Sequence, residues 1–327
     1  MFSHIMVPLD TTESAETAIP PAIAMARAHG ATMHLVLVTE LSRTDAAFDE
    51  LLESDHKQYA EGKMHPLAAR LQVALGTLVR VAHLTGTGSV AHAMAEYAKT
   101  NDVDLVVMTT HGRTGLRRAW SGSVADQLTH LIAAPVLLLR RQGLSAEAPL
   151  GLFWRMLVAL DGSEAAEAVL DPVLALDVHR KAKVILGRVV APVPLDLPES
   201  PGVVLTDADA TQAAVDEARR YLESLAVDLQ VRAGLEVDTV VELEPTGFPM
   251  VPTASTVAHL ALRERADLVA LITHQRGASR LLFASVADHL LRETSCALLV
   301  CHGAGVTALS RSSPELSRSI VPARSGG

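Results

Sequence analysis

The segment VPLDTTESAE at residues 7–16 recurs as VALDGSEAAE at residues 158–167, an offset of 151 residues. Three further matches follow in the same order, namely VAHAMAEYA (90–98) with VAHLALRER (257–265), DLVVMTTHGR (104–113) with DLVALITHQR (267–276), and SVAD at 123 with SVAD at 285. Ordered matches of this kind indicate a duplicated domain. We assign residues 1–142 to the first copy and 153–303 to the second, and expect residues 304–327 to be a disordered tail.

Strand-like and helix-like segments alternate within each copy. In the first copy we expect strands at 5–10, 33–38, 79–84, 103–108 and 134–140, and helices from about Ser14 to Gly30, over 46–75, over 89–100 and from Ser123 to Leu131. The strands are apolar throughout, which is typical of a parallel sheet covered on both faces. The pattern predicts an α/β protein of two tandem doubly wound domains, each a five-stranded parallel sheet with helices on both faces.

The composition excludes several classes of protein. Across 327 residues, Lys and Arg number 28 against 37 Asp and Glu, and a net charge of −9 argues against a protein that coats nucleic acid. Two cysteines exclude a disulfide scaffold and a four-cysteine zinc site. No apolar run reaches the length of a membrane span, and the start MFSHIMVPLD has no signal-peptide pattern. We therefore expect a soluble cytoplasmic protein that binds neither membranes nor nucleic acid.

Polar and glycine-rich loops of the first copy follow its strands, at the sheet edge where doubly wound domains bind ligands. Glycines at 112, 115 and 122 let backbone N–H groups approach an anion, and Gly122-Ser123 opens a helix whose N-terminus favours phosphate. The carboxylate of Asp10 ends the first strand and suits the hydroxyls of a sugar. These features predict a nucleotide site, against the alternatives that the glycines are ordinary loop residues and that Asp10 caps the next helix.

The same residues resemble the universal stress protein family, whose ATP-binding members carry G-x2-G-x9-G-[ST] after the fourth strand and an Asp at the end of the first. This sequence has Thr109-x2-Gly112-x9-Gly122-Ser123, with Thr109 in place of the first glycine. The resemblance covers nearly all of both copies. It implies that the first copy binds ATP with Mg²⁺ in a regulatory or stress-response role, with slow hydrolysis at most and no catalytic residue assigned.

The resemblance also implies a role for each residue of the site. Asp10 would hold the ribose, and four residues would flank adenine or sugar: Pro8, Leu9, Val38 and Met108. The phosphate cradle would comprise Gly112, Gly122, Ser123 and Val124, with His111 and Arg113 close by. The candidate set is completed by Thr11, Thr109 and Gly115. No residue is assigned to a metal site; His34 and His83 simply alternate with strand residues.

The second copy departs from this motif. When the copies are aligned on His274, Gly112 becomes Gln275 and Gly122 becomes Ala284, and the spacing from His to Ser shortens by one residue. Side chains in place of glycines would displace the backbone donors that bind phosphate. We expect no ATP in this copy, and expect its Pro-rich segments at 191–203 and 243–255 to cap the old pocket or form a partner surface.

The resemblance further implies that the fifth strands of the two copies, APVLLLR and CALLVCH, pair to form an internal pseudo-dimer. It leaves open a further homodimer and an unidentified regulatory protein partner. The alternative function is a nucleotide-independent interaction protein, or a scaffold for a small apolar ligand, in which Thr109 disables the first site. An enzyme of the wider adenine-nucleotide α-hydrolase-like group is supported by fold analogy alone.

Overall fold

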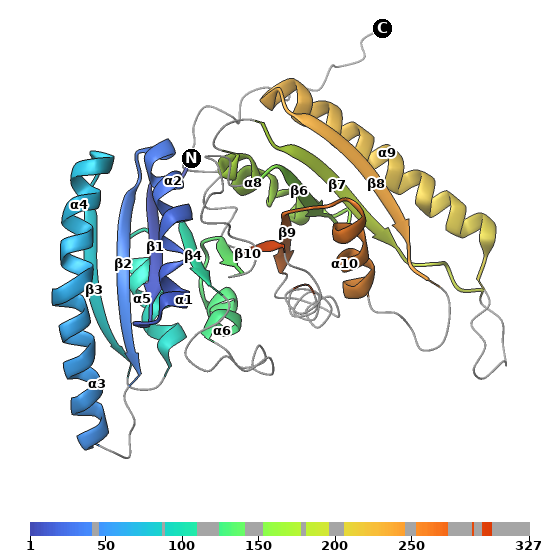
Figure 1. The fold of residues 1–327 in the computed structure, drawn as a ribbon. Coiled ribbons are helices and arrows are strands. Elements are labelled where there is room, and N and C mark those ends of the chain that lie inside the picture. Colours follow the sequence, from blue (N-terminus) through green and yellow to red (C-terminus); the bar gives the residue numbers. More distant parts are fainter. Residues whose placement is uncertain are drawn as a thin grey trace, which may run out of the picture.

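The computed structural model describes residues 1–40, 46–86, 89–109, 124–140, 153–177, 181–195, 206–245, 253–273, 290 and 296–302. Its first half comprises β1 (His4–Leu9), α1 (Glu13–Glu16), α2 (Ile19–His29), β2 (Thr32–Glu40), α3 (Ala46–Tyr59), a π-helical turn (Ala60–Met64), α4 (His65–Leu75), β3 (Val79–Gly86), α5 (Val90–Thr100), β4 (Leu105–Thr109), α6 (Val124–Leu131) and β5 (Val136–Leu139). Its second half comprises β6 (Arg155–Ala159), α7 (Glu164–Glu167), α8 (Leu170–Leu176), β7 (Lys183–Val190), α9 (Ala208–Ala233), β8 (Glu236–Leu243), α10 (Thr253–Arg263), β9 (Leu268–Thr273) and β10 (Ala297–His302). Figure 1 shows the two halves side by side.

All ten strands belong to one sheet, in the order β3-β2-β1-β4-β5-β10-β9-β6-β7-β8. Each half contributes the same order of five parallel strands, since β8-β7-β6-β9-β10 repeats β3-β2-β1-β4-β5. The register repeats too, with His4 opposite Thr32 in one half and Arg155 opposite Lys183 in the other. The predicted pair of doubly wound five-stranded domains is therefore confirmed.

The halves join through their fifth strands. Strand β5 pairs antiparallel with β10, which places Leu138 opposite Leu298 and Val136 opposite Val300. All four residues of β5 and all six of β10 are buried. The expected internal pseudo-dimer is confirmed, because each fifth strand covers what would otherwise be an apolar edge of the other half.

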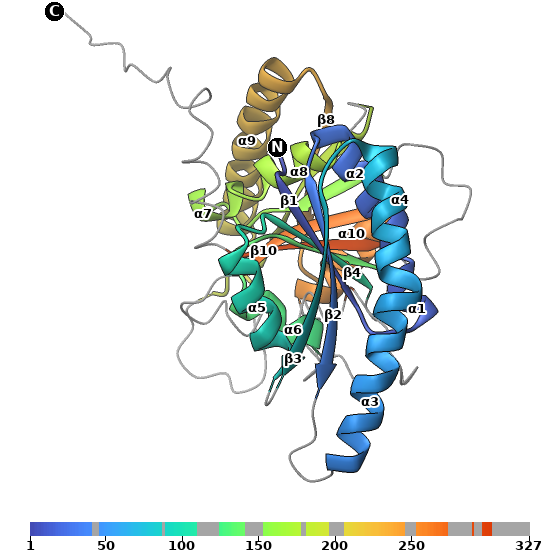
Figure 2. The same ribbon diagram turned by 90° about the vertical axis from the view of Figure 1, so that its left-hand side faces the viewer.

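Helices cover both faces of the sheet, as Figure 2 shows for α1 to α4 on one side and α5 and α6 on the other. One apolar core lies under α2, α4, α8 and α9, and includes Leu139 and Leu299. The other lies under α5, α6 and α10, and includes Leu138 and Leu298. Each core therefore continues across the β5–β10 junction, so the two halves share their apolar interior.

Two expected helices differ in detail from the sequence expectation. The helix expected from Ser14 to Gly30 is divided, because α1 ends at Glu16 and α2 begins at Ile19 with prolines in its first turn. Proline favours a first turn, where its missing N–H would have no helical partner. Gly30 ends α2 as expected, with φ of 67°. The helix expected over 46–75 has those bounds but contains the π-helical turn.

The structure also corrects one internal match. Near the end of α5, Asn101 N–H donates to the Tyr97 carbonyl; near the end of α10, Glu264 N–H donates to the Leu260 carbonyl. These bonds align the helices at an offset of 163 residues, so the VAH match at 167 is displaced by about one turn. Compared with the first copy, the second copy therefore has fewer extra residues between its first strand and α10 than the VAH match implied.

The expected tail, residues 304–327, lies outside the described residues. Among the helices that the structure describes, none combines the length and apolar character needed to cross a membrane.

Candidate functional site

The described part of the predicted site lies at the carboxyl ends of β1, β2 and β4. Three candidate side chains share one face of the sheet there, since Val38 and Met108 belong to the core under α5 and α6, and Val124 packs against that core. Pro8 is buried on β1, two residues beyond Met6 of the same core. Leu9 alternates to the opposite face, where it is 2% exposed in the other core. The Leu9 side chain is therefore a core residue, and only its backbone lies at the edge.

Asp10 and Thr11 form the turn that leaves β1, and both are partly exposed. The Asp10 Oδ1 accepts hydrogen bonds from Thr12 N–H at 3.1 Å and from Thr12 Oγ1 at 2.5 Å. Thr11 between them has φ of 68°, in the left-handed region that β-branched residues rarely adopt. The turn thus holds the Asp10 carboxylate by one of its two oxygens.

The alternative role for Asp10, as cap of the next helix, is wrong. Thr12 is the N-cap of α1, and its Oγ1 accepts a hydrogen bond from Ala15 N–H at 3.2 Å. Asp10 binds the capping residue instead of the helix. Its carboxylate is therefore a support for the cap and a group displayed at the sheet edge.

The second half repeats this turn. Asp161 Oδ1 accepts from Ser163 N–H at 2.9 Å and from Ser163 Oγ at 2.6 Å, and Ser163 caps α7. Gly162 takes the place of Thr11, with φ of 87°. The Asp-x-[Thr/Ser] turn is a shared feature of the fold, so it does not by itself distinguish a nucleotide-binding half from one without a nucleotide.

In each half, a tyrosine of a long helix donates a hydrogen bond to the glutamate that ends the short helix after the turn. Tyr59 Oη donates to Glu16 Oε1 at 2.7 Å, and Lys63 forms an ion pair with the same carboxylate oxygen. Burial raises the pKa of Tyr59 well above its usual range, and the hydrogen bond to Glu16 and the charges of Glu16 and Asp10 act in the same direction. Tyr59 therefore stays protonated and serves as a donor near Asp10.

The equivalent pair in the second half is Tyr221 and Glu167, with Tyr221 Oη 3.0 Å from Glu167 Oε1. Here the cation comes from a strand, because Cζ of Arg188 in β7 lies 5.7 Å from the centre of the Tyr221 ring. Burial again raises the pKa of Tyr221. Both halves thus keep a Tyr–Glu pair beside a cation. The cation is Lys63, from the π-helical turn, in the first half and Arg188, from strand β7, in the second.

Most of the predicted phosphate loop lies outside the described residues. Six candidates lie in residues 110–123, outside the described residues: His111, Gly112, Arg113, Gly115, Gly122 and Ser123. Gln275 and Ala284 of the second copy also lie outside them. Thr109 is the last residue of β4 and is partly exposed, so the loop begins at the same edge as Asp10. The registers place its counterpart, Ile272, in the interior at 2% exposure.

Histidines form two polar chains within the first half. The fully buried His34 lies with Nε2 3.1 Å from His4 Nδ1 and with Nδ1 3.0 Å from Tyr97 Oη. Burial, together with smaller contributions from the charges of His4 and Arg80, lowers the pKa of His34 to about 4. His83 Nε2 lies 2.7 Å from Thr39 Oγ1. Within the described ranges, no three His, Cys, Asp or Glu residues come together in a way that could hold a metal ion.

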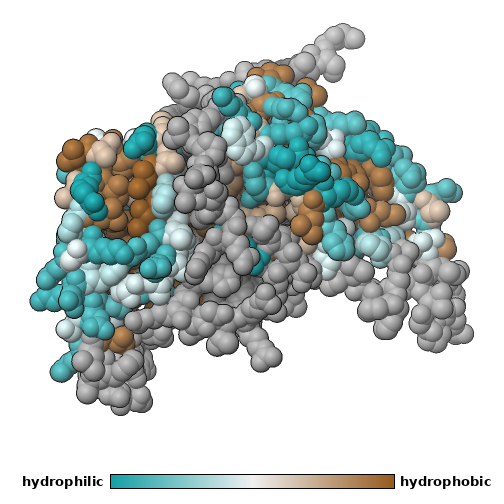
Figure 3. Space-filling model, viewed as in Figure 1, coloured by the Kyte–Doolittle hydropathy of each residue, from teal (hydrophilic) through white to brown (hydrophobic). Residues whose placement is uncertain are grey.

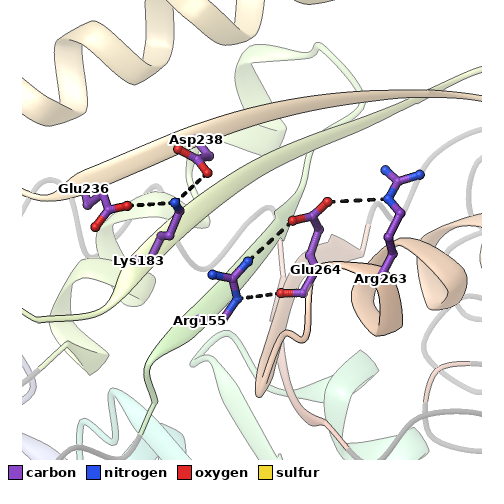
Figure 4. A network of polar contacts seen from close by, with 6 residues as sticks. All are labelled: Arg155, Lys183, Glu236, Asp238, Arg263 and Glu264. Carbon is purple, nitrogen blue, oxygen red and sulfur yellow. Dashed lines mark hydrogen bonds and ion pairs between the residues drawn. The ribbon is translucent and has the colours of Figure 1, made fainter.

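The amino-terminal edge of the second half carries ion pairs instead. Figure 4 shows Lys183 between Glu236 and Asp238, both at 2.7 Å, and Arg155 donating to Glu264. In the register of the sheet, Arg155 replaces His4 of the first half. Ion pairs this exposed contribute little to stability. Each of these cations already has an acidic partner. This edge is therefore a structural border and not a candidate ligand site.

One family model matches both halves of the chain, over residues 1–140 and 153–302, and it describes the universal stress protein family. The chain belongs to that family. Its two family domains coincide with the two halves of the sheet, which agrees with the duplication found in the sequence. Membership of the universal stress protein family supports a role in the stress response.

Individual universal stress proteins give the same assignment. A curated one from Methanocaldococcus jannaschii is 26% identical over 148 residues, which are 43% of this chain and 84% of that protein. Another, from Bacillus subtilis, is 23% identical over 43% of this chain and 100% of that protein. A crystal structure of a universal stress protein from Archaeoglobus fulgidus covers 91% of this chain and 96% of its own, with 16% identity and a TM-score of 0.63. That structure supports the tandem fold.

Proposed function

We propose that this universal stress protein binds ATP, with Mg²⁺, in its first domain, and that binding regulates a stress response. The observation that carries the proposal is the partly exposed Thr109 at the end of β4, on the same sheet edge as the fixed Asp10 carboxylate, where the second domain has the buried Ile272. A carboxylate there suits the hydroxyls of a ribose. Pro8, Val38 and Met108 lie on β1, β2 and β4 beside it and would form an apolar wall for the base.

The described residues of the candidate site fit the base and ribose end of an adenine nucleotide. An apolar wall and a carboxylate match a base and a ribose, and Thr109 brings the chain to the same edge for the phosphates. The proposed phosphate contacts remain His111, Gly112, Arg113, Gly115, Gly122 and Ser123, together with Val124 at the start of α6. Mg²⁺ on the phosphate oxygens would offset part of their negative charge.

We propose that the second domain binds no ATP. Gln275 and Ala284 replace two glycines of the motif, and Ile272 is buried where the first domain has the partly exposed Thr109. In addition, Arg188 packs over Gly162 in the turn that follows β6. These differences leave the second domain with the shared turn but without a glycine cradle for phosphate.

We propose regulation in place of rapid hydrolysis. Efficient attack by water needs a positioned base or a charge clamp at the γ-phosphate. Near Asp10, the described hydroxyl of Tyr59 is held protonated and cannot serve as a base. We further propose that the protein acts in the cytoplasm. Its partner would be a regulatory protein that responds to the bound nucleotide.

Thermal unfolding of the full chain with and without millimolar MgATP tests the proposal. A ligand at 100 times its Kd stabilises a protein by about 2.7 kcal/mol, so the wild-type Tm should rise. Gly122→Val should abolish the rise, because a side chain would enter the phosphate cradle. The matched control is Ala284→Val in the second domain, which should keep it. No rise with the wild type, or loss of the rise in Ala284→Val, would contradict the proposal.

A second candidate function is an interaction scaffold that needs no nucleotide. Figure 3 shows apolar surface between α9 and α10, over β7 and β8. Exposed apolar residues of these elements include Val227 and Val231 on α9, Leu262 on α10 and Leu243 on β8. Scattered apolar residues are common on monomers, so this surface alone does not distinguish a scaffold from a nucleotide-binding protein. Absence of any response of the wild type to MgATP would favour the scaffold.

A further inference from the structure

The side chain of Thr12 has two hydrogen-bonding tasks. Its oxygen accepts from Ala15 N–H at 3.2 Å and so caps α1. Its proton is directed to Asp10 Oδ1, at 2.5 Å. A hydroxyl has one proton to donate, so both its donor and one acceptor position are assigned. Thr12 therefore connects the start of α1 to the carboxylate at the sheet edge.

The Asp10 carboxylate is consequently held in one orientation. Oδ1 receives two hydrogen bonds from Thr12, and no bond to Oδ2 is found within the described ranges. The left-handed Thr11 fixes the backbone between them. Oδ1 is anchored and Oδ2 is available. In this arrangement Oδ2 could accept a hydrogen bond from a ligand hydroxyl without prior reorganisation of the carboxylate.

We propose that Thr12 is a positioning residue that orients Asp10 Oδ2 toward a ribose hydroxyl, and thereby sets the preference of the first domain for nucleotides that carry ribose hydroxyls. This inference rests on the proposed ATP site. Without the Thr12 hydroxyl, the carboxylate keeps only the longer hydrogen bond from the residue 12 N–H, is held less firmly, and must be ordered further when the ligand binds. Thr12 itself touches no ligand and acts through Asp10.

The second domain supplies an internal control. Ser163 makes the same two bonds, to Asp161 Oδ1 at 2.6 Å and from Ala166 N–H at 3.2 Å. Loss of that hydroxyl should remove a helix cap without touching the proposed ATP site. Serine at this position also indicates that Thr12→Ser keeps the geometry, since only a methyl group is lost.

The test compares the affinities of the full chain for MgATP and for Mg-2′,3′-dideoxyATP by calorimetric titration. A hydrogen bond to a charged acceptor is worth about tenfold or more in affinity, so the wild type should favour ATP by about that factor. Thr12→Val should lower the ratio of the two affinities toward one while leaving the dideoxy affinity unchanged, because one of the two bonds that hold Oδ1 is lost. Thr12→Ser should keep the wild-type ratio. Ser163→Val should change neither affinity, although it costs a similar amount of stability.

Thr12→Gly provides a second variant if Thr12→Val does not fold, because glycine is a tolerable N-cap that lacks the hydroxyl. An unchanged ratio in a folded Thr12 variant that still binds ATP would overturn the inference and leave the proposed function standing. Equal loss of both nucleotides would also overturn it, since that is the effect of a structural role alone. Failure of the wild type to bind ATP would overturn the proposed function, and the inference with it.

Discussion

The guanidinium of Arg188 occupies the space in which a side chain at position 162 would begin. A Cβ placed on Gly162 would lie 2.6 Å from Cζ and from Nη1 of Arg188, closer than real Cβ contacts allow. In the first domain, Thr11 stands in the turn in place of Gly162, and the fully buried Leu37 stands in the strand in place of Arg188. Strand register matches Leu37 to Arg188, so the first domain has a threonine and a leucine where the second has a glycine and an arginine.

Gly162→Thr should therefore destabilise the protein by about 1–2 kcal/mol, chiefly because φ of 87° strains a residue with a Cβ, while the flexible Arg188 guanidinium can move aside. Arg188→Leu in the same chain should recover the part of this loss that comes from displacing the guanidinium, because it places the Thr11 and Leu37 residue types at the two positions. Urea unfolding of the two single variants and the double variant measures the coupling between the sites. Additive effects of the two substitutions would show that the close approach has no energetic consequence.

Thr11→Gly should stabilise the folded protein by about 1 kcal/mol. A residue with a Cβ pays roughly 1–2 kcal/mol in the left-handed region, and glycine avoids this strain at some cost in chain entropy. The measurement is the Tm and the urea midpoint without ligand. A lower midpoint for Thr11→Gly would mean that the Thr11 side chain makes stabilising contacts in the folded state.

Acidification should weaken the fold through His34. Its pKa is about 4 in the folded protein against 6.5 for an ordinary histidine, so the unfolded chain takes up a proton that the folded chain rejects. The stability contributed by neutral His34 is complete above about pH 6.5 and is lost as the pH falls toward 4. The shift corresponds to about 3 kcal/mol at most.

The matched variant is His34→Ile, since Ile185 fills the equivalent place in the second domain. Its free energy of unfolding should fall less than that of the wild type between pH 7 and pH 4.5. Burial raises the pKa of Asp104 and Asp267, whose protonation acts in the opposite direction in both proteins. Parallel pH curves for the wild type and the variant would refute the role of His34.

A fragment of residues 1–142 should form a homodimer. It would expose β5, whose four residues are buried against β10 in the full chain. Antiparallel pairing of two copies of β5 would reproduce the junction and cover the same apolar edge. Analytical ultracentrifugation should give a dimer for the fragment, and Leu138→Lys should weaken it. A folded monomeric fragment would show that β5 needs no partner.

The strands of this protein could be read from its sequence because a covered parallel sheet requires continuous apolar runs. The run MHLVLV marked β2 to within two residues at its far end, and Gly30 marked the end of α2. The division between α1 and α2 was not recognised, although Pro20 and Pro21 signal a first helical turn. The VAH match misled because a helix tolerates a shift of about one turn, which keeps the same residues on its buried face.

The turn at Asp10 could be recognised from local chemistry, whereas contacts that depend on long-range packing were missed. Asp10 at the end of an apolar strand was recognisable, but Thr12 as cap depends on the left-handed conformation of Thr11. The Asp-x-[Thr/Ser] repeat in both copies was the available signal. Arg188 had no such signal, since its place over Gly162 depends on the packing of β7 against α9 and the turn.

Calorimetric titration of the full chain with MgATP tests the central claim most directly, when the wild type is compared with Asp10→Ala and Asp161→Ala. The two substitutions remove the same turn support from the two domains, so they have matched structural effects. One ATP per chain for the wild type and for Asp161→Ala, with an affinity about tenfold or more weaker for Asp10→Ala, is the predicted result. Two ATP per chain, no binding by the wild type, or loss of binding in Asp161→Ala would contradict the account.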